Sequence, residues 1–173
     1  MKLFLDPVLQ KDTCQYRKRR RRHLSGLSLI VLFLIVSTFV VACGGKKNIH
    51  ISMESSKFLN LDDSGAPLPV IVRVYQLKNK ENMEKADFLS LWKSDKDILG
   101  EDLLDRSEVT LLPESTIELN VESGKDAGYL AVMVLFRKPQ GGSWRQIIPL
   151  KESRVHSVKI SVHERSLKII NVK

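Results

Sequence analysis

The chain has 173 residues and a formal net charge of +8, from 28 Lys and Arg against 20 Asp and Glu. Eight of the basic residues but only two of the acids precede residue 43, so residues 43–173 keep 20 bases and 18 acids, a net charge of +2. A basic excess within residues 43–173 would have been the main support for nucleic-acid binding by the domain itself. The charge distribution therefore argues against nucleic acid as a partner.

The first 42 residues have the composition of an export signal. A basic segment, RKRRRRH at 17–23, precedes an uncharged apolar run of 19 residues at 24–42. This order, with a small residue at the end of the run, is typical of a secretory signal peptide. On length alone, an uncleaved membrane-spanning anchor is the alternative. In both cases the basic residues stay in the cytoplasm and the following chain is exported.

The apolar run ends in Val40-Val41-Ala42-Cys43, which resembles a bacterial lipobox. The resemblance implies that the Cys43 thiol carries diacylglycerol, that residues 1–42 are cleaved off, and that the new N-terminus is acylated in turn. More than one acyl chain is needed for a stable anchor. Residues 43–47 then form the lipidated cysteine and a flexible tether, and glycine after the cysteine favours the outer membrane in Gram-negative bacteria. The other cysteine, Cys14, lies in the predicted signal, which excludes a disulfide in the exported domain.

Residues 48–173 mostly show the alternation of apolar and polar residues that is typical of β-strands. The segment 129–136, YLAVMVLF, is apolar on both faces and predicts a central strand, while Pro149 predicts a strand end, a bulge or an edge strand. Eight short strands with turns between them predict an antiparallel β-sandwich. The predicted strands span 48–55, 70–77, 107–113, 115–121, 129–136, 144–150, 158–163 and 167–172.

The interval 81–104 departs from the strand pattern because it is rich in acids and helix formers. Met83, Phe88, Leu91 and Trp92 recur in it at helical spacing. We therefore expect two short helices, inserted between strands and packed on the sandwich. Trp92 and Trp144 are expected in the core or on a sheet face rather than as platforms for a ligand.

The interval 56–69, SKFLNLDDSGAPLP, is long for a sandwich loop. Long ordered loops often carry function. This one combines the apolar residues Phe58, Leu59 and Leu61 with the turn-forming sequence Asp62-Asp63-Ser64-Gly65. The loop is therefore the first candidate for a binding site.

No catalytic or metal site is expected from the motifs. DKDILG at 95–100 begins like a calcium loop, but Leu99 stands where the fifth position needs an oxygen ligand. The chain also lacks a nucleophile-elbow motif and a glycine-rich phosphate loop. The sequence therefore favours a binding module over an enzyme, with no metal and no small-molecule substrate.

Three segments behind the lipobox together resemble the TssJ family, the outer-membrane lipoproteins of the bacterial type VI secretion system. They are LNLDDSGAPLPVIVRVYQLK at 59–78, ADFLSLWKSDKDILGEDLL at 86–104 and YLAVMVLFRKPQGGSWRQIIPL at 129–150. The resemblance implies a transthyretin-like two-sheet β-sandwich of about eight strands with a small inserted helical element. It implies a non-enzymatic protein with no cofactor beyond the lipid on Cys43, held in the inner leaflet of the outer membrane and facing the periplasm.

The resemblance also implies a partner. TssJ proteins bind the periplasmic C-terminal region of TssM, within an envelope complex of TssJ, TssL and TssM that docks the contractile secretion apparatus. In the family, the loop between the first two strands makes this contact, and here that loop is 56–69. The implied contact residues, apolar anchors and acids that set register, are Phe58, Leu59, Asn60, Leu61, Asp62 and Asp63.

Two alternatives remain open at this point. Leu59 and Leu61 could instead fold back onto the sandwich as part of its core. The function could be that of a periplasmic β-sandwich lipoprotein that binds a small ligand or peptidoglycan outside type VI secretion, and a hydrolase with a site assembled from distant residues is a weaker third hypothesis.

Overall fold

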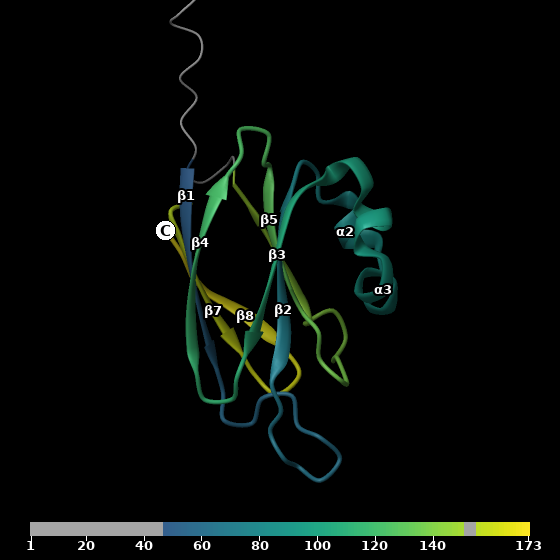
Figure 1. Ribbon diagram of the computed structural model, residues 1–173, viewed down its shortest axis with the longest axis vertical. Helices are drawn as coiled ribbons and strands as arrows, with labels where there is room; N and C mark the ends of the chain where they lie inside the picture. The colour runs from purple at the N-terminus through teal and green to yellow at the C-terminus, as the bar shows by residue number, and fades with distance from the viewer. Residues whose placement is uncertain (1–46, 151–154) are drawn as a thin grey trace, which may run out of the picture. The chain divides into compact units, whose positions relative to one another are not determined.

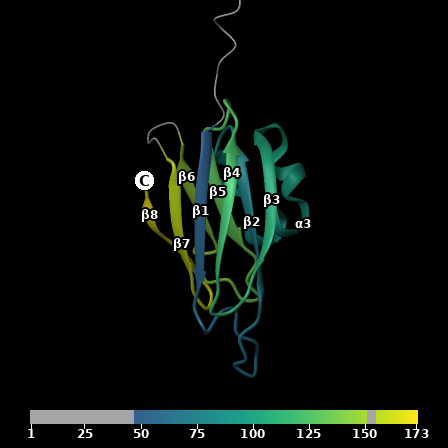
Figure 2. The same cartoon turned by 60° about the vertical axis from the view of Figure 1, so that its left-hand side comes forward.

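The computed structural model describes residues 47–150 and 155–173, which form two facing four-stranded β-sheets (Figures 1 and 2). The predicted β-sandwich of eight strands is therefore confirmed. The first sheet contains, in spatial order, β4 (Thr116–Ser123), β1 (Lys47–Ser55), β7 (Ser157–Val162) and β8 (Leu167–Val172). The second contains β3 (Leu103–Leu111), β2 (Val70–Leu77), β5 (Tyr129–Val134) and β6 (Arg145–Pro149).

Alternating residues of β1 and β7 supply the first sheet's half of the core. Ile49, Ile51 and Met53 of β1 are buried, as are Val158 and Ile160 of β7. Burying each such side chain stabilises the fold by about 1.5–3 kcal/mol relative to leaving it exposed. The two strands run parallel, whereas the expected sandwich was wholly antiparallel. The alternation reveals which face of a strand is buried but not the direction of its neighbour, so the pattern could not predict this pairing.

The second sheet is buried on both faces at its centre. Val70, Val72 and Val74 of β2 are buried toward the first sheet, while Tyr75 and Leu77 are buried on the other face. Such two-sided burial explains the continuous apolar run of β5, which lies between β2 and β6 as the central strand that was predicted. Pro149 ends β6, an edge strand, in agreement with its missing N–H donor.

A helical insertion between β2 and β3 covers the outer face of the second sheet (Figure 1). It contains α2 (Glu81–Lys85), α3 (Phe88–Leu99) and the 3₁₀ turn η2 (Gly100–Asp102). Asp87 caps α3 by accepting a hydrogen bond of 3.1 Å from the Ser90 N–H. The predicted helices are thus present, although β3 begins at Leu103 and shortens the helical interval.

A buried cluster of charges fixes α3 on the sheet. The Asp95 carboxylate accepts a 2.9 Å hydrogen bond from the Tyr75 hydroxyl and pairs with Arg73 and Arg106, each at 3.2 Å. Arg73 and Arg106 both also reach Glu108, at 2.8 Å. Burial raises the pKa of Tyr75, and the hydrogen bond to the carboxylate raises it further. The hydroxyl therefore stays protonated and donates to Asp95, which ties the helix to β2 and β3.

Arg145 of β6 fixes the shorter helix. Its guanidinium donates to the backbone carbonyls of Met83, Glu84 and Ala86 at the end of α2. These are carbonyls that a helix end leaves without internal partners, so Arg145 acts as a C-terminal cap. The guanidinium also lies 4.6 Å from the ring of Trp144. Burial lowers the pKa of Arg145.

The two tryptophans have different environments. Trp144 is buried, with Phe88 packed edge-on against it at 5.3 Å between ring centroids, as expected for a core residue. Trp92 is 49% exposed on α3, so its expected place in the core or on a sheet face was wrong. Helical spacing grouped Trp92 with Phe88 and Leu91, but Trp92 lies just outside the face that the sheet covers.

Candidate functional site

The loop at 56–69 joins β1 to β2 and extends beyond the strand ends, at the end of the sandwich opposite Lys47 (Figures 1 and 2). Backbone hydrogen bonds fix its base: the Ser56 N–H donates to the Val162 carbonyl at 2.9 Å, and the Leu68 N–H donates to the Leu59 carbonyl at 3.1 Å. The loop therefore has a defined shape between a fixed entry and a fixed exit.

Asn60 holds the loop to the rest of the domain. Its side-chain amide donates to the Pro69 carbonyl at 3.1 Å, and its Oδ1 accepts from the Arg137 N–H at 2.9 Å. Its own N–H donates to the Glu164 carbonyl at 3.0 Å. The backbone φ of +48° lies in the left-handed region, which asparagine adopts more readily than most residues. The implied contact residue Asn60 is buried and positions the loop.

Leu59 is fully buried and belongs to the hydrophobic core. For Leu59 the structure therefore follows the alternative in which the loop's apolar residues pack on the sandwich. Leu61 is partly exposed, two residues further along. The loop thus has one apolar side chain that anchors it and another that reaches its surface.

Phe58 is the large apolar side chain that the loop presents to solvent. It is 55% exposed, and the Lys57 ammonium lies 4.8 Å from its ring centroid. Its neighbour Leu59, by contrast, is buried in the core. An exposed aromatic ring beside a fixed backbone is the kind of residue that anchors protein interfaces.

Asp62 shapes the tip of the loop. One carboxylate oxygen accepts from the N–H and the hydroxyl of Ser64, at 2.8 and 2.7 Å, and from the Ala66 N–H at 2.9 Å. The hydrogen bond from the Ser64 hydroxyl lowers the pKa of Asp62, with a further contribution from Ala66. Gly65 adopts a φ of +84°, which favours glycine. The acid that was implied to set register with a partner here folds its own turn.

Asp63 connects the loop to the turn between β5 and β6. Its carboxylate pairs with the Lys138 ammonium and, at 3.4 Å, with the Arg137 guanidinium. The hydrogen bond from Lys138 lowers the pKa of Asp63, and the charges of Lys138 and Arg137 add to the effect. Sequence reasoning missed Arg137 and Lys138, because they lie in the interval between the predicted strands 129–136 and 144–150, which was taken only as a turn. The signal available was a basic pair next to a turn, which does not reveal its partner.

The six implied contact residues thus have different roles in one loop. Phe58, Leu61 and Asp63 reach the surface, while Leu59, Asn60 and Asp62 hold the loop's conformation. Such an arrangement can bind a partner through an apolar ring and a charged tip. Among residues 47–150 and 155–173, no group of three or more His, Cys, Asp or Glu side chains is placed to hold a metal ion.

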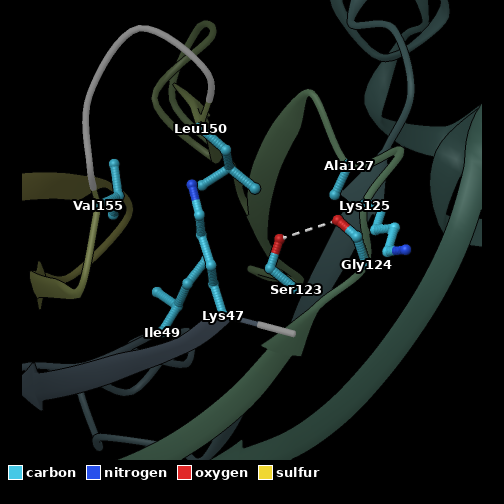
Figure 3. Close-up of a pocket in the computed structure, with 8 residues that line it drawn as sticks. All are labelled: Lys47, Ile49, Ser123, Gly124, Lys125, Ala127, Leu150 and Val155. Carbon is cyan, nitrogen blue, oxygen red and sulfur yellow. Dashed lines mark hydrogen bonds between the residues drawn. The ribbon is translucent and has the colours of Figure 1, made fainter. Parts of the chain in front are cut away.

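A cavity of about 320 Å³ lies at the opposite end of the sandwich, where β1 begins (Figure 3). Its polar lining consists of Lys47, Lys125 and Ser123, whose hydroxyl donates to the Gly124 carbonyl at 3.4 Å. The described lining residues include no acid or histidine that could act as a general acid or base.

The predicted lipidation residue Cys43 lies outside the described residues, as do the predicted signal peptide and most of the tether. Within the part of the chain that is described, no helix is long and apolar enough to cross a membrane.

Comparison with protein families gives one match over most of the domain. Residues 47–165 match the sequence model of the type VI secretion lipoproteins, described as VasD, EvfM and TssJ. The chain belongs to the TssJ family of type VI secretion lipoproteins. This family consists of structural lipoproteins of the secretion system's envelope and is not an enzyme family, which confirms the expectation of a non-enzymatic protein.

Several solved structures have the same fold, and this chain aligns with nearly the whole length of each. The Serratia marcescens protein Lip, a membrane-bound component of the type VI secretion system, is 24% identical; 72% of this chain and 97% of Lip align, with a TM-score of 0.66. A chain of the structure described as a TssM C-terminal domain from EAEC is 24% identical, over 73% of this chain and 99% of that one, with a TM-score of 0.65. A chain of a type VI membrane complex is 25% identical, over 73% and 100%, with a TM-score of 0.68. The curated proteins compared contain no match.

Proposed function

We propose that the chain is an outer-membrane lipoprotein of the type VI secretion envelope complex. Acyl chains on Cys43 hold it in the inner leaflet, and the loop 56–69 binds the periplasmic C-terminal region of TssM. In this role it joins TssL and TssM to dock the contractile apparatus. Residues 1–42 serve as the signal peptide, 43–47 as the lipidated cysteine and tether, and 48–173 as the binding domain.

The observation that carries the proposal is the loop's construction in a chain of this family. Phe58 is exposed next to Leu59 and Asn60, which fix the loop through the core and through three hydrogen bonds. An ordered loop loses little conformational freedom on binding, so more of the contact energy appears as affinity. A chain of the same fold also occurs in the structure described as the TssM C-terminal domain and in that of the type VI membrane complex.

The position of the loop fits an envelope bridge. Lys47 follows Cys43 by four residues in sequence and begins β1, while the loop lies at the far end of that strand (Figure 1). A lipid at one end leaves the other end free to meet a protein that approaches from the periplasm. This geometry supports assigning the anchor to Cys43 and the partner contact to the loop.

The loop assignment is tested by the affinity of the full chain for the TssM periplasmic region. We expect the double variant Phe58→Asp/Leu61→Asp to weaken binding at least 100-fold, because charges replace the apolar contacts at the interface. Ile170→Asp is the matched control, since Ile170 is 53% exposed and lies on β8, outside the loop. Unchanged affinity of the loop variant, with an unchanged melting temperature, would contradict the assignment.

The anchor is tested separately by Cys43→Ser. This variant should incorporate no labelled palmitate and should leave the outer-membrane fraction, because the acceptor thiol is missing. Retention in the outer membrane with labelling equal to that of the unsubstituted chain is the opposite result, and it would place the anchor elsewhere.

A further inference from the structure

An apolar groove on the helical side of the domain is not used by the proposed function. We name it the α3 groove; it has a volume of about 510 Å³. Leu89 and Trp92 on α3 are 53% and 49% exposed and form one wall, with Phe88 beside them. Ile71 of β2 and Leu135, which directly follows β5, also line the groove. Contiguous exposed apolar side chains of this kind mark interaction sites.

The α3 groove is continuous with the loop 56–69. Ile71 stands two residues after the loop's last residue, and its carbonyl accepts a 2.9 Å hydrogen bond from the Leu135 N–H. Arg137, which also lines the groove, donates its N–H to Asn60 in the loop at 2.9 Å. The loop and the groove are therefore parts of one surface, and a partner that contacts Phe58 has the groove next to it.

The charge of the groove indicates what it accepts. Arg137 is the one charged side chain among the described residues that line it. Its guanidinium pairs with Asp63 at 3.4 Å, and both side chains are largely exposed. An exposed pair of this kind is worth little, so an incoming carboxylate can replace Asp63 as the partner of the guanidinium. Arginine also binds carboxylates through two parallel hydrogen bonds, which fixes their orientation.

We propose that the α3 groove receives a segment of the loop's own partner that carries a bulky apolar side chain next to a carboxylate. The apolar side chain packs against Leu89 and Trp92, and the carboxylate binds Arg137. The helical insertion thereby forms the second half of the binding surface. This inference rests on the proposed function, since it takes the loop's partner as the occupant.

The test uses the full chain, purified from membranes in detergent, with its tryptophans replaced by 5-fluorotryptophan. The two ¹⁹F resonances are assigned with Trp92→Phe, and the TssM periplasmic region is then added. We expect the Trp92 resonance to shift and that of buried Trp144 to move less. In the variant Phe58→Asp/Leu61→Asp, the Trp92 resonance should stay in place at the same partner concentration.

Affinities supply the second measurement. We expect Leu89→Ala/Trp92→Ala to weaken binding about 30-fold, the level at which interface residues count as principal anchors. Arg137→Gln should weaken it about tenfold and reduce its dependence on salt, while the backbone N–H to Asn60 is kept. Ile170→Ala, an equally exposed apolar residue on β8, should bind like the unsubstituted chain.

The outcomes separate the groove from the loop. If the loop variant loses binding while the groove variants keep it, the groove assignment is overturned and the proposed function stands. A Trp92 resonance that shifts with the concentration of the chain alone points to a second copy as occupant and also overturns it. Absence of binding by the unsubstituted chain overturns the proposed function and the groove with it.

Discussion

The helical insertion and the loop 56–69 are both additions between strands, but they are held in opposite ways. Buried charges hold the insertion: Asp95 lies between Arg73 and Arg106, and Arg145 caps α2. The loop depends on the amide of Asn60 and the buried side chain of Leu59. A buried charge that loses its partner is costly, so the insertion is expected to behave as a rigid wall. The tip of the loop is held by hydrogen bonds to Asp62 and by the exposed ion pairs of Asp63, which are weaker than a buried pair.

Removing the buried carboxylate should have the largest effect. We expect Asp95→Ala to lower the free energy of unfolding by about 3 kcal/mol, because it removes the buried carboxylate that accepts from Tyr75 and leaves Arg73 and Arg106 to share the more exposed Glu108. Urea unfolding followed by circular dichroism measures the difference.

The control for this variant is Asp97→Ala, on the same helix but exposed. Surface substitutions of this kind usually change stability by no more than about 0.5 kcal/mol. Equal effects of the two substitutions would show that the buried cluster contributes no more than ordinary surface charge, and the contrast between insertion and loop would then fail.

A smaller effect is expected at the loop's anchor. Asn60→Ala removes hydrogen bonds to Pro69 and Arg137 and places alanine at a positive φ, so it should destabilise the domain by about 2 kcal/mol. Asn60→Gly loses the same hydrogen bonds but tolerates the φ, and should cost about 1 kcal/mol less.

Hydrogen exchange shows where the loss falls. The amide of Arg137, which donates to the Asn60 side chain, should exchange faster in both Asn60 variants. The amides of α3 should lose no more protection than the fall in global stability accounts for. If the α3 amides lose protection in parallel with the loop, the two regions are coupled and the comparison drawn above is wrong.

The smallest effect concerns pH. The pKa of Asp62 is lowered from its ordinary value of 3.8, chiefly by the Ser64 hydroxyl. A depressed pKa means that the turn is supported above the ordinary value and loses that support as the pH falls through the lowered pKa. The Ser64 and Ala66 amide resonances should therefore move in acid, below pH 3.8. In Asp62→Asn, which keeps an oxygen acceptor but does not titrate, this movement should disappear.

Most of the fold could be predicted from the sequence, because a strand with one buried face alternates apolar and polar residues. Ile117 and Leu119, each followed by a polar residue, show this alternation. Pro149 indicated a strand end or edge for an equally local reason, the missing N–H. The parallel pairing of β1 with β7 could not be predicted, since it depends on how the chain returns to the first sheet. Trp92 was assigned wrongly because helical spacing does not define where the buried face ends.

The candidate site was predictable only in part. Its location followed from the loop's length and the family resemblance, but spacing could not tell that Leu59 is buried while Phe58 is exposed. The pairing of Asp63 with Lys138 joins positions 75 residues apart, which no local pattern reveals. The cap that Arg145 forms on α2 is equally remote in sequence.

The central claim is that the exposed face of the loop contacts TssM in the assembled envelope complex. The most direct test places a photo-cross-linking amino acid at position 58 in cells that assemble the secretion system, with position 170 on β8 as the control. We predict a cross-link to TssM from position 58 and none from position 170. Cross-links to TssM from position 170 alone, at equal protein levels, would contradict the account.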